Sequence, residues 1–577
     1  MRICSLALGI SLTLSAALAG ESDGHRAKYE DYWFYCSHPF QTNADIGYYR
    51  DLIAKAKAAG YNGMVSPIRL GYNTHWNEKS RASFAEVRRI CDVAGIEIVP
   101  CIWSVGYGAM IGVNNELVES EPVRDIPYVA RDGKAVFKSA TVSVSMVNGD
   151  FESFNAAKNR FTGWRADHPG AESFVDTTVS HGGRASIRFE PDLAKDTNGL
   201  ARLYQIVKVK PGHRYRFTAW IRADGLEPSV ETLRMLVERK GVRNSLVAGK
   251  DVNRLLLAEG WRKVETDFNS GEATEVYLYV GTWGGKHGKF WVDDCSIKET
   301  GLREVCQRKG TPFEVRNAVT GQVYARGKDY EMPPVRMPKG EELEFKIPSG
   351  SAIKEGDDLL VDAYVPAQNG PKSQRSTCMS DPRLYELFEK SAAGIMEACA
   401  PRKWLLAVDE VRNGNTCPLC TARKTDMAHI FGECVTKMHA IIKKVRPDAV
   451  VYAWSDMFDP NHNARDNYYG CKGTFAGAWD LIPKDIVMCC WYRKKCELTV
   501  PFFTRHGFRV LAAGYYDYDG SDAEKDRPWV DILNRTPGAK GFMYTTWQRK
   551  YDLLPVFGKF IHECGRPCRE GLSGNGE

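Results

Sequence analysis

Several features that mark particular protein classes are missing from this sequence of 577 residues. Beyond its first residues it has no apolar run long enough to span a bilayer, so we expect no membrane span. It also has no basic tail or stripe, because 78 basic and 72 acidic residues are spread along the chain and leave a net charge of only +6. That distribution argues against nucleic acid as a partner.

The one long apolar run lies at the N-terminus and resembles a targeting segment. Arg2 precedes the apolar stretch Ile3–Leu18, which is too short to cross a membrane, and Ala17-Leu18-Ala19 places small residues where signal peptidase cleaves. We therefore predict a signal peptide at 1–19 and an exported protein, periplasmic or extracellular. No cysteine lies at the cleavage point, which argues against a lipoprotein.

Cysteine is present at a moderate level, with 17 residues, and Cys4 is removed with the signal peptide. That number over this length does not indicate a disulfide scaffold. Cys417 and Cys420 form a Cys-Pro-Leu-Cys pair in an expected loop, where a local disulfide and half of a metal site are both open. A tetrahedral zinc site needs four ligands, and Cys434 is a candidate for the third.

The first part of the chain alternates between strand and helix patterns. Short apolar strands are expected at 31–36, 61–67 and 96–102, and amphipathic helices at 46–59 and 81–94. This βαβαβ order indicates a parallel sheet. The pattern then changes, because 147–300 holds short alternating strands separated by turn residues, which is typical of a β-sandwich or jelly roll.

A further β-rich stretch at 301–375 reads as a small sheet, after which the α/β pattern returns. Five more strands follow, and three plus five strands alternating with helices predict a (β/α)₈ barrel interrupted after its third strand. An open doubly wound sheet is the alternative. The expected strands and segments are these: strands 404–410, 449–456, 486–492, 509–517 and 541–547; barrel parts 28–146 and 376–565; an insertion at 147–300 and 301–375; and a disordered tail at 566–577.

Aromatic rings and carboxylates gather at the expected C-terminal strand ends, where barrel active sites lie. Aromatic rings pack on the flat C–H faces of sugars, and carboxylates suit glycosidic cleavage, whereas the strand ends are poor in the histidines that metal chemistry would need. Asp409 and Glu410 follow Val408, so strand alternation turns one of the two inward unless the strand bends. The other expected substrate-binding residues are His38, Trp103, Trp454, Asp456, Trp491, Tyr515, Tyr516, Asp517 and Trp547.

The Asp409-Glu410 pair ending the fourth strand, with tryptophans and a Tyr/Asp cluster on later strands, resembles family 20 glycoside hydrolases, the β-N-acetylhexosaminidases. The resemblance implies that Asp409 orients the substrate's 2-acetamido group, whose carbonyl oxygen attacks the anomeric carbon, and that Glu410 is the general acid and then base. It implies that Tyr515 or Tyr516 binds the acetamido oxygen and that the later tryptophans wall the sugar pocket.

Two positions depart from that family's pattern. Val408 stands where the family commonly has histidine, and Gln548 follows Trp547 where the family has a glutamate nearby. These departures leave the exact substrate open, and the chain resembles a distant relative of that family more than a typical member.

The inserted segment resembles carbohydrate-binding modules of the jelly-roll type, through its opening Val147-Asn-Gly-Asp-Phe-Glu152, Trp164, and its closing Phe290-Trp-Val-Asp-Asp294. In such modules the two ends meet, often around a structural calcium ion, and oxygen ligands suit calcium. The candidate calcium ligands here are Asp150, Glu152 and Asp293, and the candidate sugar platforms are Tyr204, Trp220 and Trp283.

Together these patterns predict an exported glycoside hydrolase that acts on a polysaccharide or glycan, needs no cofactor for catalysis, and releases β-linked N-acetylhexosamine with retention. One alternative is a barrel glycosidase in which Asp456 or Asp517 works with Glu410 on another sugar. The other is a polysaccharide-binding protein without catalysis. The sequence leaves the oligomeric state open.

Overall fold

The computed structural model describes most of the chain between Tyr29 and Gly565. The expected signal peptide at 1–19, the tail at 566–577 and the expected site residue Tyr516 lie outside the described residues. The described ranges are 29–68, 77–111, 116–139, 144, 146–192, 194, 196–227, 232–241, 246–252, 260–337, 341–367, 374–515, 517 and 522–565.

Eight parallel strands form a closed barrel, in which the last strand pairs with the first. This confirms the predicted fold. Three barrel strands precede the insertion and five follow it, so the expected count is also correct. The strands, in barrel order, are β1 Asp31–Tyr35, β2 Gly63–Pro67, β3 Glu97–Ile102, β21 Lys403–Leu406, β22 Val450–Trp454, β23 Val487–Cys490, β24 Arg509–Tyr515 and β25 Gly541–Thr545.

Helices surround the barrel, and local sequence signals set their ends. Thr42 and Asp45 form a capping box at the start of the first helix, and Asp381 caps a helix that has proline at its first position. Within the described segment 455–486, between β22 and β23, the chain forms only 3₁₀ turns and loops. The helices are α1 Asn43–Ala58, α2 Glu78–Ala94, α3 Pro382–Cys399, α4 Pro418–Thr421, α5 Met427–Val445, α6 Cys496–Arg505, α7 Arg527–Asn534 and α8 Leu554–Cys564.

The insertion contains a jelly roll made of two five-stranded antiparallel sheets. Inward-facing apolar side chains from both sheets form a core separate from that of the barrel. The first sheet has the order β15 Arg262–Asn269, β12 Arg214–Glu227, β17 His287–Glu299, β10 Ser186–Phe189 and β9 Ser173–Asp176. The second has the order β14 Leu246–Asp251, β13 Leu233–Arg239, β16 Glu275–Thr282, β11 Arg202–Lys208 and β8 Arg165–Ala166; β6 Phe154–Asn155 and β7 Arg160–Phe161 form a separate pair.

A third sheet corrects the expected domain boundaries. Strands β4 and β5 fall in the stretch assigned to the barrel rim, yet they pair with strands from the 301–375 segment. The jelly roll is therefore inserted into this small sheet, which is itself inserted into the barrel. The strand order is β18 Glu314–Asn317, β20 Asp358–Pro366, β4 Ser120–Arg131, β5 Lys134–Phe137 and β19 Phe345–Lys346.

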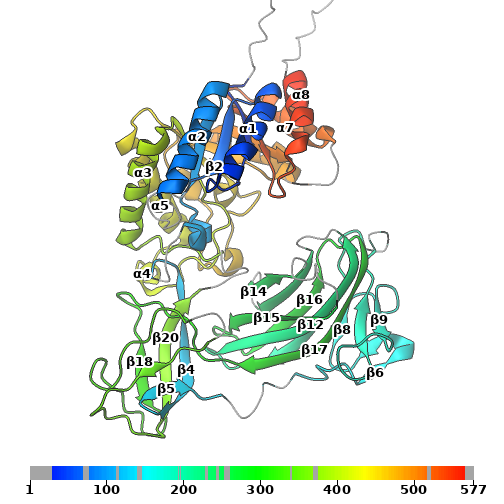
Figure 1. Ribbon diagram of the computed structural model, residues 1–577, viewed down its shortest axis with the longest axis vertical. Helices are drawn as coiled ribbons and strands as arrows, with labels where there is room; N and C mark the ends of the chain where they lie inside the picture. The colour runs from blue at the N-terminus through cyan, green and yellow to red at the C-terminus, as the bar shows by residue number, and fades with distance from the viewer. Residues whose placement is uncertain are drawn as a thin grey trace, which may run out of the picture.

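The two inserted units lie on one side of the barrel, with β4 and β20 rising toward it beside α4 (Figure 1). Because the insertion leaves from the end of β3, this is the side of the C-terminal strand ends. The jelly roll is held to the small sheet by Glu121, whose carboxylate accepts hydrogen bonds from Arg239 at 3.0 Å and from Asn269 at 2.5 Å. In the described part of the chain, no helix combines the length and apolar character that crossing a bilayer requires.

Candidate active site at the barrel mouth

The acidic pair lies beyond the end of its strand, not within it. β21 ends at Leu406, Val408 is fully buried, and Glu410 has a left-handed φ of 45°. The chain therefore bends at this point, so the alternation expected for an extended strand does not apply. Asp409 and Glu410 are both half-buried, and both lie near Asp456 from the end of β22.

The Glu410 carboxylate is surrounded by hydrogen-bond donors. One oxygen accepts from the Tyr107 hydroxyl and, at 3.2 Å, from the Gln374 amide, and the other lies 3.5 Å from the Arg412 guanidinium. Arg412 also donates to the Gln374 side-chain oxygen at 2.7 Å and lies over the ring of Tyr469. Burial and the Glu410 charge raise the pKa of Tyr107, so its hydroxyl stays a donor. Tyr107, Gln374 and Arg412 thus form one connected hydrogen-bond network with the Glu410 carboxylate.

The other two carboxyl groups have the opposite environment. Asp456 is fully buried and accepts hydrogen bonds from the Glu410 main-chain N–H at 3.0 Å and from the Asn463 amide at 2.8 Å. Burial, opposed by these bonds but assisted by the Glu410 charge, raises its pKa to about 7. Burial together with Asp456 and Glu410 raises the pKa of Asp409 well above its usual range. Three close carboxyl groups thus share fewer than three charges near neutral pH.

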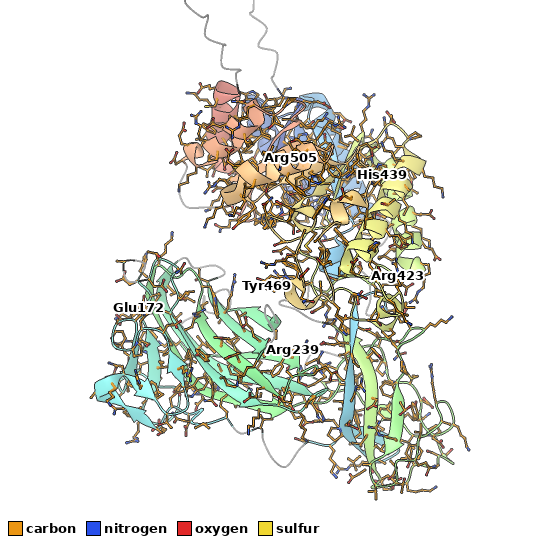
Figure 2. All side chains as sticks on the ribbon, turned by 180° about the vertical axis from the view of Figure 1, so that it is seen from behind. Glu172, Arg239, Arg423, His439, Tyr469 and Arg505 are labelled. Atoms are coloured by element: carbon orange, nitrogen blue, oxygen red, sulfur yellow. The ribbon has the colours of Figure 1, made fainter. Side chains whose placement is uncertain are left out.

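Aromatic rings line part of the same end of the barrel. The His462 ring stacks on Tyr492 at 4.5 Å and meets Trp491 edge-on at 4.2 Å, beside the loop that carries Asp456. Trp547 is 49% exposed and packs against Tyr35 at 4.8 Å. Figure 2 shows Tyr469 on the side of the barrel that faces the jelly roll.

Two of the expected site residues belong to the core instead. Trp103 is fully buried and stacks on Phe388 of α3 at 4.7 Å. Tyr515 is 1% exposed and stacks on Tyr544 at 4.8 Å, with Phe557 of α8 beside it. Both face the layer between strands and helices, so the structure does not support their predicted role in substrate binding.

Three further predicted residues are held in place by local structure. The His38 ring is hydrogen-bonded to Asp45 at 2.9 Å and stacks on Tyr48 after β1. Asp517 accepts from the Thr546 hydroxyl and from the main chain of Trp547 and Gln548, so it fixes the turn after β25. Trp454 is 3% exposed and packs inside the barrel. None of the three contacts the acidic group directly through a described hydrogen bond.

Sequence reasoning missed four polar residues that surround the acidic group. Tyr107 follows β3, Gln374 lies where the insertion returns to the barrel, and Arg412 and Asn463 lie in the loops after β21 and β22. Arg412 could have been noticed, because a cation two residues after Glu410 is placed to pair with it. Nothing in the sequence connects Gln374 with Glu410, because the turns of the loops bring them together.

The jelly roll carries an aromatic cluster on one outer sheet face. Tyr277 and Tyr279 alternate with buried residues of β16 and lie beside Tyr204 of β11, with ring centroids 5.1 to 5.8 Å apart. Trp283 extends the row at 6.2 Å from Tyr279, and Arg202 lies over its ring. This sheet, which contains β14 and β16, lies on the barrel side in Figure 1. We call these four rings the aromatic face.

Trp220, the third expected platform, lies on the opposite sheet. It stacks on His181 at 3.8 Å, and with Asp150 and Asp294 it lines a groove of about 460 Å³.

The expected calcium ligands make other contacts. Glu152 accepts from the main-chain N–H groups of Arg184 and Ala185, and Asp293 from those of His181 and Gly182. Asp150 is exposed. Among the described residues these three do not form a compact group of metal ligands. Calcium binding by these three residues of the jelly roll therefore stays a prediction.

Comparison with known proteins identifies the inserted module. Residues 144–287 match the family model described as a carbohydrate binding domain. No sequence match is found among curated proteins. The solved structure of TmCBM61 with β-1,4-galactotriose is 17% identical, covers 28% of this chain and 100% of its own, and has a TM-score of 0.21. A CBM4 structure is 16% identical and covers 27% and 100%, with a TM-score of 0.21.

A cyclase from Fischerella sp. TAU is 14% identical to this chain, covers 28% of it and 97% of its own length, and has a TM-score of 0.22. The three structures match only the extent of one module. The chain thus combines a carbohydrate binding domain with a TIM-like barrel, a pairing that suggests a carbohydrate-active enzyme.

Proposed function

We propose that this chain is an exported glycoside hydrolase that cleaves a polysaccharide or glycan at the mouth of its barrel. The observation that carries the proposal is the group formed by Asp409, Glu410 and Asp456 at the C-terminal strand ends, on the side where the carbohydrate binding domain lies. Barrel enzymes place their catalytic groups at this end, and glycosidic cleavage uses a pair of carboxyl groups in different protonation states. Export is inferred from the apolar N-terminal segment.

The environments of the carboxyl groups suggest how they divide the work. A glycosidase needs one protonated carboxyl to donate to the leaving oxygen and one carboxylate to stabilise or attack the anomeric carbon. Hydrogen-bond donors surround the Glu410 carboxylate, whereas burial raises the pKa of Asp409 and Asp456 and so favours their protonated forms. Glu410 is therefore the carboxylate, and Asp409 or Asp456 supplies the proton.

A narrower proposal concerns the sugar. The adjacent Asp409-Glu410 pair at the end of the fourth barrel strand supports substrate-assisted cleavage of β-linked N-acetylhexosamine, with Asp409 orienting the acetamido group and Glu410 acting as acid and base. Here Glu410 donates the proton and Asp409 does not, which is the reverse of the roles in the general proposal. The burial of Tyr515 removes one of the two tyrosines expected to bind the acetamido oxygen.

The test of the general proposal is a screen of aryl glycosides and polysaccharides with the full chain. Glu410→Gln should lower kcat by a factor of about 10²–10⁴, because the carboxylate is lost while its shape and hydrogen-bonding neighbours remain. Asp480→Asn is a matched control, since Asp480 is an exposed acid, with its side chain 61% accessible, on a loop after β22. Near-normal turnover by Glu410→Gln, with an unchanged melting curve, would show that the site is elsewhere.

The two mechanisms give different products and inhibitor profiles. Substrate-assisted cleavage requires a 2-acetamido group, retains the anomeric configuration and is inhibited by a thiazoline that mimics the cyclised intermediate. Cleavage by two protein carboxyls proceeds without the acetamido group and ignores the thiazoline. NMR of the first product formed, with substrates that carry or lack the acetamido group, distinguishes them.

A further inference from the structure

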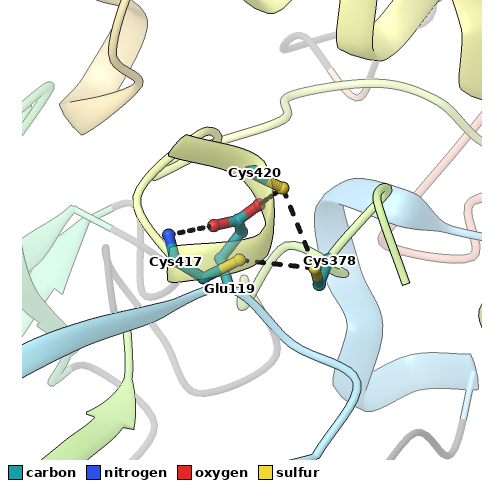
Figure 3. A group of neighbouring side chains, drawn as sticks. All are labelled: Glu119, Cys378, Cys417 and Cys420. Carbon is teal, nitrogen blue, oxygen red and sulfur yellow. Dashed lines mark hydrogen bonds between the residues drawn. The ribbon is translucent and has the colours of Figure 1, made fainter. Parts of the chain in front are cut away.

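Three cysteines and one glutamate meet in the neck between the barrel and the inserted domains (Figure 3). Cys417 and Cys420 lie at the start of α4 and within it, after the loop that begins with the acidic pair. Cys378 comes from the segment that returns to the barrel, and Glu119 from the segment that leaves it. All four are fully buried. Cys434, the expected third thiol, lies instead in α5 with its sulfur 3.8 Å from that of Met438, and Cys378 takes that place.

The distances within this group are close to those around a four-coordinate metal ion, and the shorter ones would lengthen slightly around a bound ion. The Cys378 sulfur lies 3.3 Å from that of Cys417 and 3.8 Å from that of Cys420, and the Cys420 sulfur lies 2.9 Å from a Glu119 oxygen. The four ligand atoms all lie within 4.8 Å of one another. Zinc–sulfur bonds of about 2.3 Å in a tetrahedron place the sulfurs about 3.8 Å apart.

We propose that Glu119, Cys378, Cys417 and Cys420 bind one zinc ion. The donor set is soft and rich in thiolate, which selects zinc over calcium or magnesium. Four protein ligands leave no open position for water or substrate, so the ion is structural and takes no part in the reaction. Among the described residues this is the only group of histidine, cysteine or acidic side chains compact enough to hold a metal ion.

The surroundings of the group orient its ligands. The second Glu119 oxygen accepts hydrogen bonds from the main-chain N–H groups of Thr416 at 3.0 Å and Cys417 at 2.8 Å, and from the Thr416 hydroxyl at 3.1 Å. That leaves the first oxygen directed at the thiols. Such outer contacts fix the geometry of metal ligands. All the described donors to Glu119 are uncharged, so a bound cation would supply the positive charge that this buried carboxylate lacks.

Arg308 adds a second positive charge near the cluster. It donates to the carbonyl oxygens of Glu116 and Val118, three positions and one position before Glu119, and its charge acts on Cys378 and Cys417. Three thiolates and one carboxylate around Zn²⁺ leave an excess of negative charge, which a buried guanidinium offsets.

The ion would connect the segments that carry the acidic site. Gln374, which contacts Glu410, lies four positions before Cys378, and Arg412 lies five before Cys417. The two segments are already adjacent, since the Arg412 N–H donates to the Ser376 hydroxyl at 3.0 Å. A zinc ion at this point would hold the outgoing chain, the returning chain and the acidic loop together, and so fix the donors around Glu410.

A disulfide is the competing explanation, because an exported protein meets an oxidising environment. A disulfide between any two of these cysteines would leave the third cysteine as a thiol and the buried Glu119 carboxylate with uncharged donors alone. Zinc binding uses all four groups at once and protects the thiolates from oxidation. The two explanations predict different metal content and different thiol counts.

The experiment measures zinc in the full chain, expressed with added zinc and purified without chelator. Elemental analysis should give about one zinc per chain, and cobalt replacement should give the thiolate-to-metal charge-transfer band of a sulfur-rich tetrahedral site. Removal of the metal by a strong chelator should lower the melting temperature by at least about 5 °C. Zinc re-addition should restore it.

Two variants and a control locate the site. Glu119→Gln keeps a side-chain oxygen for the Thr416 and Cys417 N–H groups but weakens zinc binding at least about tenfold. Cys420→Ser should lose the ion, and Cys434→Ala, which removes a buried thiol outside the group, should keep it. Zinc-free protein in which mass spectrometry finds a disulfide among the three cysteines, or three alkylatable thiols, overturns the proposal, as does equal zinc loss in Cys434→Ala. The readouts do not depend on the proposed hydrolase activity.

Discussion

Burial shifts the pKa of single residues at the barrel mouth, and His462 is the simplest example. Its ring stacks on Tyr492 and meets Trp491 edge-on, and burial, with a smaller effect of Arg465, lowers its pKa from 6.5 to about 4. The folded state therefore favours the neutral ring. Its contribution to stability is complete above pH 6.5 and is lost as the pH falls toward 4, because the unfolded chain binds the proton more tightly.

We expect His462→Phe to flatten the pH dependence of stability. Phenylalanine keeps the stacking but does not titrate, so it removes a loss of about 2–3 kcal/mol between pH 7 and pH 4. Urea unfolding of wild type and variant at several pH values, followed by tryptophan fluorescence, measures this. His429→Gln is the control, because the His429 side chain is 59% exposed. Parallel pH profiles for wild type and His462→Phe would contradict the assignment.

The sequence was a good guide to residue type at the site and a poor guide to side-chain direction. Trp103 and Tyr515 were expected at the mouth because they stand at strand ends, but both have left-handed φ values, 55° and 69°. That conformation breaks the alternation that holds inside a strand, and both rings turn toward the helices. The same effect at Glu410 lets both acids of the pair face one group of charges.

At the scale of elements, the aromatic face of the jelly roll resembles a sugar platform more closely than Trp220 does. Its rings line one sheet that lies on the barrel side, whereas Trp220 lies on the opposite sheet. Sugars bind such rows through their C–H faces, and a row of rings holds several sugar units.

Tyr279→Ala should therefore weaken polysaccharide binding by about tenfold, or about 1–2 kcal/mol, since Tyr279 touches all three other rings of the face. Trp220→Ala should leave the affinity unchanged. Affinity electrophoresis of the full chain against a panel of soluble polysaccharides measures both. If Trp220→Ala abolishes binding and Tyr279→Ala does not, the sugar site lies on the other sheet.

Elements within a domain could be predicted to within a few residues, because apolar periodicity is local. The expected strand at 96–102 is β3 Glu97–Ile102, and the expected helix at 81–94 is α2 Glu78–Ala94. The pairing of β4 with β20 could not be predicted, because the whole jelly roll separates the two strands in sequence. Local periodicity carries no information on which distant strand completes a sheet.

The inserted domains separate the two parts of the barrel in sequence, so contacts between β1–β3 and β21–β25 must hold the whole molecule's barrel closed. A buried polar group at the opposite end of the barrel from the acidic site provides such contacts. Asp31 of β1 accepts hydrogen bonds from Lys403 of β21 at 2.6 Å and from the Tyr452 hydroxyl of β22 at 2.5 Å. It is fully buried, and the three side chains join the first part of the barrel to the second.

Lys403→Met should destabilise the barrel by about 3–5 kcal/mol, because it leaves the Asp31 carboxylate buried without a cation. Burial already raises the pKa of Asp31 even though the charge of Lys403 lowers it. Without Lys403, no cation offsets the cost of burying the charged carboxylate. Hydrogen exchange of peptides covering β1 and β21 measures the effect in the full chain. This local measurement does not require the barrel and the inserted domains to unfold in a single cooperative transition.

Two further variants separate charge from packing in this group. Lys559→Met, which removes a lysine whose side chain is 75% exposed, should leave the exchange of β1 and β21 unchanged. Adding Asp31→Asn to Lys403→Met should recover part of the lost stability, because no buried charge then remains. If the double variant is instead less stable than Lys403→Met alone, the two substitutions act independently and the ion pair is not what joins the two parts of the barrel. Pairing of β1 with β2 and β25 then closes the barrel.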